Sequence, residues 1–323
     1  MNQQDTAKIL PQMAAYLIAQ RVGVYLIAGD LTNHFAQSLA AVEKLQRLIA
    51  PAQVRFIAGN HDMLHDITYA GLESPLAPTY LHRGYLDVAG TNWQIIGNNG
   101  WYDYQFAHNL WGRDFATWKR AFWVDGSIDQ PQGDVARMDR VLAQVTVQLQ
   151  QAQLAHKRVL FMTHFVPRQA YIRYTTDDRF WNMANAMLGS PRLGRLLESY
   201  HVPVVQFGHV HRHFRPQTFG NTTYYNQSVG YYNRRINEWT QTDFMTEWRQ
   251  RLHFLTLKWK KSQKVLDGLC IFLYDSEVDS LRRFIFWWGS EVWLNAADCK
   301  SAPSGSVVRI HSPPFYYWAI AKW

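Results

Sequence analysis

The chain has 323 residues, a formal net charge of +8 and two cysteines, Cys270 and Cys299. This length can bury a sizeable core and suggests about two domains. The excess of lysine and arginine is modest and scattered, whereas nucleic-acid binders concentrate basic residues in a stripe, so the charge gives no strong nucleic-acid signal. Two isolated cysteines argue against a disulfide framework and a thiolate metal site. No opening segment is typical of a signal peptide and no apolar run reaches membrane-spanning length, so we expect a cytoplasmic protein without a membrane partner.

Helical and strand-like segments alternate along the first 226 residues. Apolar residues at helical spacing predict a first helix over residues 7–21, with Pro11 tolerated only near its first turn. The other predicted helices cover residues 35–49, 134–154 and roughly 180–198, and the predicted strands cover residues 24–28, 54–58, 93–97, 158–163, 203–207 and 222–226. Strands that alternate with helices indicate a layered α/β domain in which helices cover a central sheet.

Four of the predicted strands end in side chains that can bind a metal ion. These ends are Gly29-Asp30, Gly59-Asn60-His61-Asp62, His164, and Gly208-His209-Val210-His211. Ligands collect beyond the carboxyl ends of strands in open sheets, so we expect the four ends to share one site. A structural interpretation competes at each end, because Gly59-Asn60 is also good turn chemistry and a lone strand-end histidine is commonly structural. The recurrence at four strand ends favours the shared site.

The residue types at these strand ends suit a particular class of metal. Carboxylate, imidazole and amide oxygen are ligands of Mn, Fe, Zn or Ni ions. Two such ions about 3.5 to 4 Å apart can clamp the attacking and leaving oxygens of a displacement at phosphorus. One carboxylate must then bridge the ions, and Asp30 is the candidate. The sequence therefore predicts two divalent metal ions and a small phosphoester substrate.

The order of these motifs resembles that of the calcineurin-like metallophosphoesterases, over roughly residues 15 to 230. The resemblance implies a layered α/β fold with central β-sheets flanked by helices. It also implies hydrolysis of a phosphate mono- or diester by a hydroxide that bridges two metal ions. The ligands it implies are Asp30 between the ions, Asn60, His164 and His209 on the second ion, and His211 on the first. His61 resembles the residue that protonates the leaving oxygen or binds the phosphoryl group, with Asp62 as its orienting partner.

The family's opening Asp-x-His motif has no counterpart here. Asp5-Thr6-Ala7 is not such a motif, and no apolar strand surrounds it. We therefore expect that the first strand is missing, which exposes backbone edges, and that the first ion keeps only Asp30 and His211. Either the true start lies upstream or the gene has lost its beginning. The alternative function is a catalytically inactive fragment of the same fold that binds a metal or a phosphorylated ligand.

Residues 258–323 differ in character from residues 1–257, which we assign to the N-terminally incomplete phosphoesterase domain. Both cysteines lie in this tail, and clear amphipathic periodicity fades there. Residues 298–301 and 308–310 can be encoded by codons that match the anticodon loop and the T-loop of a transfer-RNA gene, in that order. We expect a frameshift near residue 258 and no domain beyond it. The alternative is a genuine aromatic-rich domain, associated with a membrane through residues 284–293.

Candidate substrate contacts follow two of the strands. Trp101 and Tyr102 follow one strand, and Arg168 follows the strand that ends at His164. Aromatic faces can stack on a base and arginine can hold a phosphate through two hydrogen bonds, but these aromatics can equally cap the core. Residues 226–235 follow the last motif and can close the rim of the site. Neither the choice between mono- and diester nor the oligomeric state can be predicted.

Overall fold

The structure is a computed structural model that describes residues 5–110, 112–176, 179–233, 238–257 and 317–321. Residues 1–257 and 316–323 make up one compact unit, and residues 258–315 make up a second, which lies outside the described residues. The expected frameshifted tail falls almost entirely on that second unit and stays a prediction. None of the described helices is long and apolar enough to cross a membrane.

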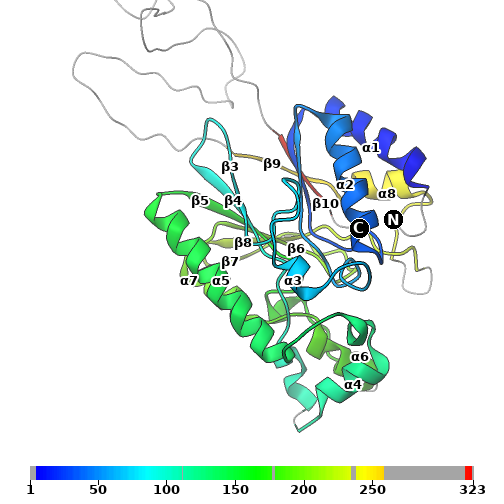
Figure 1. The fold of residues 1–323 in the computed structure, drawn as a ribbon, viewed down its shortest axis with the longest axis vertical. Helices are drawn as coiled ribbons and strands as arrows, with labels where there is room; N and C mark the ends of the chain where they lie inside the picture. Colours follow the sequence, from blue (N-terminus) through cyan, green and yellow to red (C-terminus); the bar gives the residue numbers. More distant parts are fainter. Residues whose placement is uncertain (1–4, 111, 177–178, 234–237, 258–316, 322–323) are drawn as a thin grey trace, which may run out of the picture. The chain divides into compact units, whose positions relative to one another are not determined.

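Helices and strands alternate along the first unit (Figure 1). The α-helices are α1 (Thr6–Ala19), α2 (Phe35–Ile49), α3 (Tyr69–Leu72), α4 (Phe115–Phe122), α5 (Asp134–Leu154), α6 (Arg179–Ala184), α7 (Pro191–Ser199) and α8 (Phe244–Arg251). The 3-10 helices are η1 (Gln105–Leu110), η2 (Val124–Ser127), η3 (Gln169–Tyr171) and η4 (Asn185–Met187). The strands are β1 (Val22–Ile27), β2 (Gln53–Phe56), β3 (Tyr85–Asp87), β4 (Trp93–Gly97), β5 (Arg158–Met162), β6 (Val204–Phe207), β7 (Gln217–Phe219), β8 (Thr222–Asn226), β9 (His253–Thr256) and β10 (Tyr317–Ala321).

The described strands form two sheets. One has the order β2-β1-β10-β9, and the other has the order β3-β4-β5-β6-β8-β7. In the first sheet β1 runs parallel to β2 and β10, and β10 runs antiparallel to β9. In the second sheet β4, β5, β6 and β8 are parallel, and the antiparallel strands β3 and β7 form its edges. Both sheets therefore have parallel strands whose carboxyl ends can meet.

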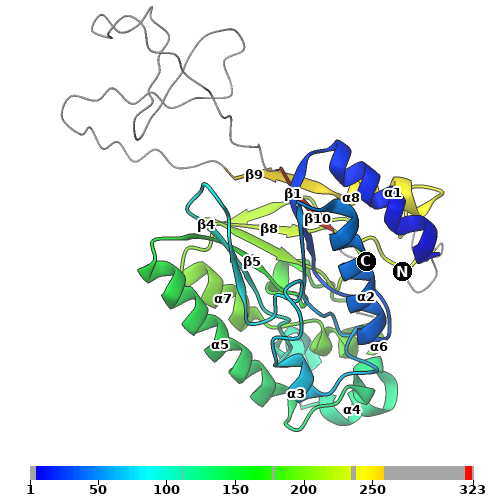
Figure 2. The same cartoon turned by 45° about the horizontal axis from the view of Figure 1, so that its top comes forward.

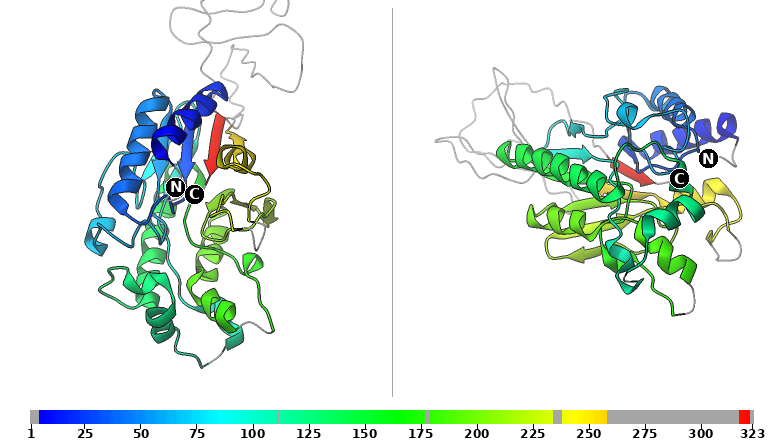
Figure 3. Two further views of the ribbon diagram at one scale, coloured as in Figure 1. Left: turned by 90° about the vertical axis from the view of Figure 1, so that its right-hand side faces the viewer. Right: turned by 60° about the horizontal axis from the view of Figure 1, so that its bottom comes forward.

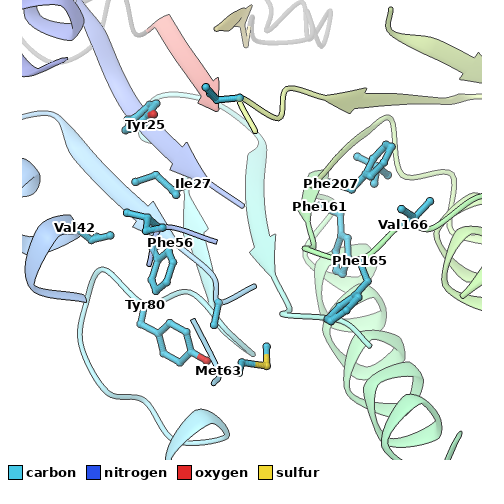
Figure 4. Close-up of a cluster of buried hydrophobic side chains, with 14 of the residues drawn as sticks. Tyr25, Ile27, Val42, Phe56, Met63, Tyr80, Phe161, Phe165, Val166 and Phe207 are labelled. Carbon is cyan, nitrogen blue, oxygen red and sulfur yellow. The ribbon is translucent and has the colours of Figure 1, made fainter. Parts of the chain in front are cut away.

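The two sheets pack face to face, because alternate residues of their strands share one apolar cluster. Leu26 of β1 lies in this cluster with Ile95 of β4 and Leu160 of β5. The opposite face of β1 carries Ile27, which belongs to the larger cluster together with Val42 of α2 (Figure 4). Side chains alternate between the two faces of a strand, and both faces of β1 are covered, so every residue of β1 is buried. Full burial of one such aliphatic side chain contributes roughly 1.5 to 3 kcal/mol.

Helices cover the outer faces of the two sheets. Figures 1 and 2 show α1, α2 and α8 beside the four-stranded sheet and α5 and α7 beside the six-stranded sheet. The two further views in Figure 3 show the same layers. The predicted layered α/β fold with flanked sheets is therefore confirmed. Its predicted helices over residues 35–49 and 134–154 have the observed bounds.

The single helix predicted over residues 180–198 is wrong, because the structure divides this segment. α6 ends at Ala184, η4 follows it and ends at Met187, and α7 begins at Pro191. A proline disfavours the helical conformation in the residue before it but suits the first turn of a new helix. The Ser190 side chain caps α7 by accepting a hydrogen bond from the backbone N–H of Arg192.

Strand β10 covers the edge of β1 that does not face β2. Its residues pair in parallel with β1 from Val22 to Ile27. Backbone hydrogen bonds therefore satisfy this edge, and the exposed edge expected there is not found among the described strands. These five residues belong to the stretch for which we expected no domain, and they extend the first unit.

Candidate metal centre

Four of the predicted site residues lie together where strands of both sheets end. Asp30 follows β1, Asn60 follows β2, His164 follows β5 and His209 follows β6. The ligand atoms of Asp30, His164 and His209 lie within 4.8 Å of one another. Among the described residues, this is the group of three that could hold a metal ion. All except His209 are almost completely buried. The topology thus brings together residues that are up to 179 positions apart, from Asp30 to His209.

Short distances connect the lone-pair atoms of this cluster. Nε2 of His164 lies 3.1 Å from Oδ1 of Asn60, 3.1 Å from Nδ1 of His209 and 3.3 Å from Oδ1 of Asp30. Nδ1 of His209 lies 3.0 Å from the same Asn60 oxygen. Two oxygens and two ring nitrogens therefore converge on a small volume.

The tautomer of His164 shows that this volume suits a cation. Its Nδ1 lies 2.8 Å from the carbonyl oxygen of Ala28, so this nitrogen must donate the hydrogen bond. In the neutral ring, Nε2 then carries a lone pair, and it faces oxygens of Asn60 and Asp30 that are acceptors as well. A divalent cation would satisfy acceptors that otherwise face one another, and a histidine ligand commonly donates its other N–H to a carbonyl. The donor set therefore fits a divalent metal ion.

A buried carboxylate fixes the orientation of the Asn60 amide. Its Nδ2 donates to Oδ1 of Asp125 at 2.7 Å, which turns the amide oxygen toward the two histidines. Asp125 is 1% exposed, and this burial raises its pKa to about 7. Asp125 lies on η2, in the segment between β4 and α5, where no sequence motif marks it. It is a site residue that the sequence did not predict.

Two glycines allow the strand ends to approach one another. A Cβ on Gly59 would lie 2.0 Å from Oδ1 of Asp30 and 2.4 Å from Cε1 of His164. A Cβ on Gly29, where φ is +90°, would lie 2.3 Å from the backbone nitrogen of Gly59. Asp30 and His209 themselves adopt positive φ angles of 61° and 66°, which is uncommon outside glycine and concentrates at functional sites.

Asp62, the predicted orienting partner of His61, bonds the backbone of two loops, and its predicted role stays a prediction. Its carboxylate accepts hydrogen bonds from the backbone amides of Asp30 (2.5 Å), Leu31 (2.9 Å), Thr32 (3.3 Å) and Gly59 (2.8 Å) and from the hydroxyl of Ser38 (2.6 Å). Asp62 is fully buried, and burial together with the nearby charge of Asp30 raises its pKa to about 6. Its bonds tie the loop after β1 to the loop after β2, which places Asp30 against Gly59.

His61 is held by a residue that the sequence did not predict. Its Nδ1 lies 3.1 Å from Oδ1 of Asn33, in the loop after β1. Its backbone N–H donates to Oδ1 of Asp30 at 3.2 Å. The ring is half-buried and lies 5.6 Å, centroid to centroid, from the ring of Tyr231. His61 therefore borders the cluster and reaches its exposed rim.

His211 lies at the same rim, outside the metal-binding group. Its Nδ1 is 2.7 Å from Oε1 of Glu238, and its ring lies 4.6 Å from that of Tyr231. Burial alone would raise the pKa of Glu238, but hydrogen bonds with His211 and with the backbone amide of Asn233 lower it below its usual range. The predicted role of His211 as a ligand of the first ion stays a prediction.

The candidate substrate contacts in the loops have structural partners. Trp101 and Tyr102 are both completely buried, so they cap the core, as the alternative interpretation states. Arg168 donates to both carboxylate oxygens of Glu198, at 2.6 and 3.0 Å. In the predicted rim segment, Tyr231 is 38% exposed and lies beside both rim histidines.

Comparison with known proteins identifies the family and the fold. Residues 2–213 match the model of a family described as calcineurin-like phosphoesterase. A phosphopantetheinyl hydrolase from Mycobacterium tuberculosis has the same fold, with a TM-score of 0.52 and 16% identity over 72% of this chain and 83% of that one. A dimetal phosphatase from Danio rerio has a TM-score of 0.40 and 12% identity, over 68% and 76% of the two chains. A search of curated proteins finds no match.

Proposed function

Because the chain belongs to the calcineurin-like phosphoesterase family, we propose that it hydrolyses a phosphate mono- or diester with two divalent metal ions at the strand ends. The observation that carries this proposal is the convergence of Asp30, Asn60, His164 and His209 through acceptor atoms 3.0 to 3.3 Å apart. Divalent ions in such a site lower the pKa of a bound water and polarise a phosphoryl oxygen.

Different side chains would hold the two ions. Asn60, His164 and His209 would bind one ion, and His211 would bind the other. Asp30 would be shared between the ions; its Oδ1 lies 3.3 Å from Nε2 of His164 and accepts a hydrogen bond from the backbone N–H of His61. The candidate metals are Mn, Fe, Zn and Ni, which accept mixed nitrogen and oxygen ligands.

His61 acts on the substrate. Its backbone N–H donates to Oδ1 of Asp30 and its ring lies 5.6 Å from that of Tyr231, so a phosphoester bound at the cluster would lie beside it. Asn33 accepts a hydrogen bond from Nδ1, and in the protonated ring Nε2–H can donate to a phosphoryl oxygen or to the leaving oxygen. An imidazole suits this transfer because its ordinary pKa lies near neutrality.

One observation favours a second candidate function. His211 lies outside the group formed by Asp30, His164 and His209, and it contacts Glu238 instead. A chain with only one complete metal site would bind a metal or a phosphorylated ligand without catalysing hydrolysis. Metal stoichiometry separates the two candidates, since two ions per chain support the enzyme and one ion supports the binding scaffold.

Hydrolysis of p-nitrophenyl phosphate and bis-p-nitrophenyl phosphate with added Mn²⁺ tests the proposed activity. The wild-type chain should turn over at least one of the two esters, and chelation of the metal should stop the reaction. Asp30→Asn should lower kcat/KM by at least about 100-fold, because it removes the shared anionic ligand. Unchanged turnover in Asp30→Asn would refute the bridging role. A folded wild-type chain that binds Mn²⁺ and hydrolyses neither ester supports the scaffold.

A further inference from the structure

The buried contact between Asn60 and Asp125 points to a role for a residue outside every motif of the chain. We propose that Asp125 is a positioning residue, which fixes the orientation of the Asn60 amide so that its oxygen faces the metal centre. This inference rests on the proposed function, because it concerns the same metal site.

A primary amide can exchange the positions of its oxygen and nitrogen at little steric cost, so its hydrogen-bond partners decide which of the two atoms faces the metal centre. Oδ1 of Asn60 faces the lone pair on Nε2 of His164 at 3.1 Å, because His164 donates its other N–H to Ala28. The reversed amide could donate to that nitrogen, whereas the observed orientation presents its oxygen to His164 and also to Nδ1 of His209 at 3.0 Å. The partner of the amide nitrogen on the far side therefore helps to decide between the two orientations.

Asp125 supplies that partner. Its Oδ1 accepts a hydrogen bond from Nδ2 of Asn60 at 2.7 Å, so the amide nitrogen faces Asp125 and the amide oxygen points the other way. Asp125 is 1% exposed and Asn60 is also 1% exposed, so water does not compete for either group. The carboxylate thus keeps the amide oxygen directed at the metal centre before an ion arrives.

The segment that carries Asp125 is firmly anchored at both ends. On α4, Nζ of Lys119 lies 2.8 Å from Oδ1 of Asp134, at the start of α5, and both residues are buried. Beyond η2, Asp129 accepts a hydrogen bond from the backbone N–H of Tyr69 at 2.7 Å. A carboxylate held on such a frame can direct a ligand, since partners of metal ligands typically change metal affinity roughly 10- to 100-fold when substituted.

An exchange of the two side chains tests this role, with Mn²⁺ affinity measured by calorimetry on the full chain. Asp125→Asn should weaken binding roughly 10- to 100-fold, because the new amide can donate to the Asn60 oxygen and turn it away. Asn60→Asp should also weaken binding, because it sets two carboxylates against each other. The double variant restores an amide facing a carboxylate, so its affinity should return to within a few-fold of wild type, far above the product of the single losses.

Asp139→Asn is the matched control, because it changes a half-exposed carboxylate of α5 that pairs with Arg192 and not with Asn60. It should bind Mn²⁺ as the wild type does, and thermal unfolding shows that each variant is folded. A double variant that binds no better than the product of its single losses overturns the inference, as does Asp125→Asn with wild-type affinity. A folded wild-type chain that binds no Mn²⁺ overturns the proposed metal site and the inference together.

Discussion

The inner and outer parts of the site are built differently. In the inner cluster, acceptor atoms of Asn60, His164 and Asp30 face one another inside the protein. At the rim, His61 and His211 are half-buried, and each has a ring nitrogen bonded to a side chain of a neighbouring loop. The inner cluster is therefore organised for a cation. The rim histidines are held by Asn33 and Glu238, where the proposed roles are substrate contact for His61 and binding of the first ion for His211.

The supports of the two parts differ as well. The inner ligands are fixed by the Ala28 carbonyl and by the buried carboxylates of Asp62 and Asp125. Rigid strand ends and a buried second layer hold groups more exactly than loops do. Substitution of an inner residue should therefore remove metal and turnover together, whereas substitution at the rim should affect turnover first.

His164→Ala should have the largest effect and would break the inner cluster. His164 is completely buried, and its Nε2 lies 3.1 to 3.3 Å from all three other ligand atoms. Its removal should lower Mn²⁺ affinity by more than about 100-fold and abolish turnover, because the loss of a ligand should exceed that of a partner of a ligand. Equilibrium dialysis measures the affinity. His201→Ala, at an exposed turn, is the control, and equal affinities in the two variants would contradict the assignment.

His61→Ala should separate the two parts of the site. Turnover should fall roughly 100- to 10,000-fold, the usual contribution of a positioned acid or base. Mn²⁺ affinity should stay within a few-fold of wild type, since the His61 side chain is not in the metal-binding group. Steady-state kinetics and calorimetry on one preparation test both expectations. Joint loss of metal and turnover would mean that His61 has a structural role.

Glu238→Gln should have the smallest effect and would sharpen the description of the rim. The variant keeps the shape of the side chain but removes the charge that holds His211 at 2.7 Å. We expect kcat/KM to fall roughly 10-fold, as for other partners of functional histidines, with no change at the inner cluster. Titration of the inner ion by calorimetry checks the second expectation. A loss of inner-site affinity would show that the two parts are one unit.

The sequence predicts six of the ten described strands and the residues at the ends that form the site, because strand periodicity and the Gly-Asp, Gly-Asn-His-Asp and Gly-His-x-His motifs are local signals. The sequence does not predict the short strands β3, β7 and β9 or strand β10. It does not predict Asn33, Asp125 or Glu238, because their contacts depend on how distant segments meet. Asp62 shows the limit most clearly. The sequence places this carboxylate next to His61, and only the structure shows that the turn directs it to four backbone amides and to Ser38.

The helix predicted over residues 180–198 failed for a different reason. Its apolar pattern continues through the break, and only Pro191 and the capping Ser190 mark the new start. Turn chemistry outweighs periodicity at that point. The buried Trp101 similarly shows that an aromatic residue after a strand does not by itself indicate a substrate contact.

Anomalous diffraction from crystals grown with Mn²⁺ tests the central claim most directly, because it locates the ion among named atoms. The account predicts an anomalous peak bonded to Oδ1 of Asn60, Nε2 of His164, Nδ1 of His209 and the carboxylate of Asp30. No peak at this position under saturating Mn²⁺, or a peak only at other residues, would contradict it.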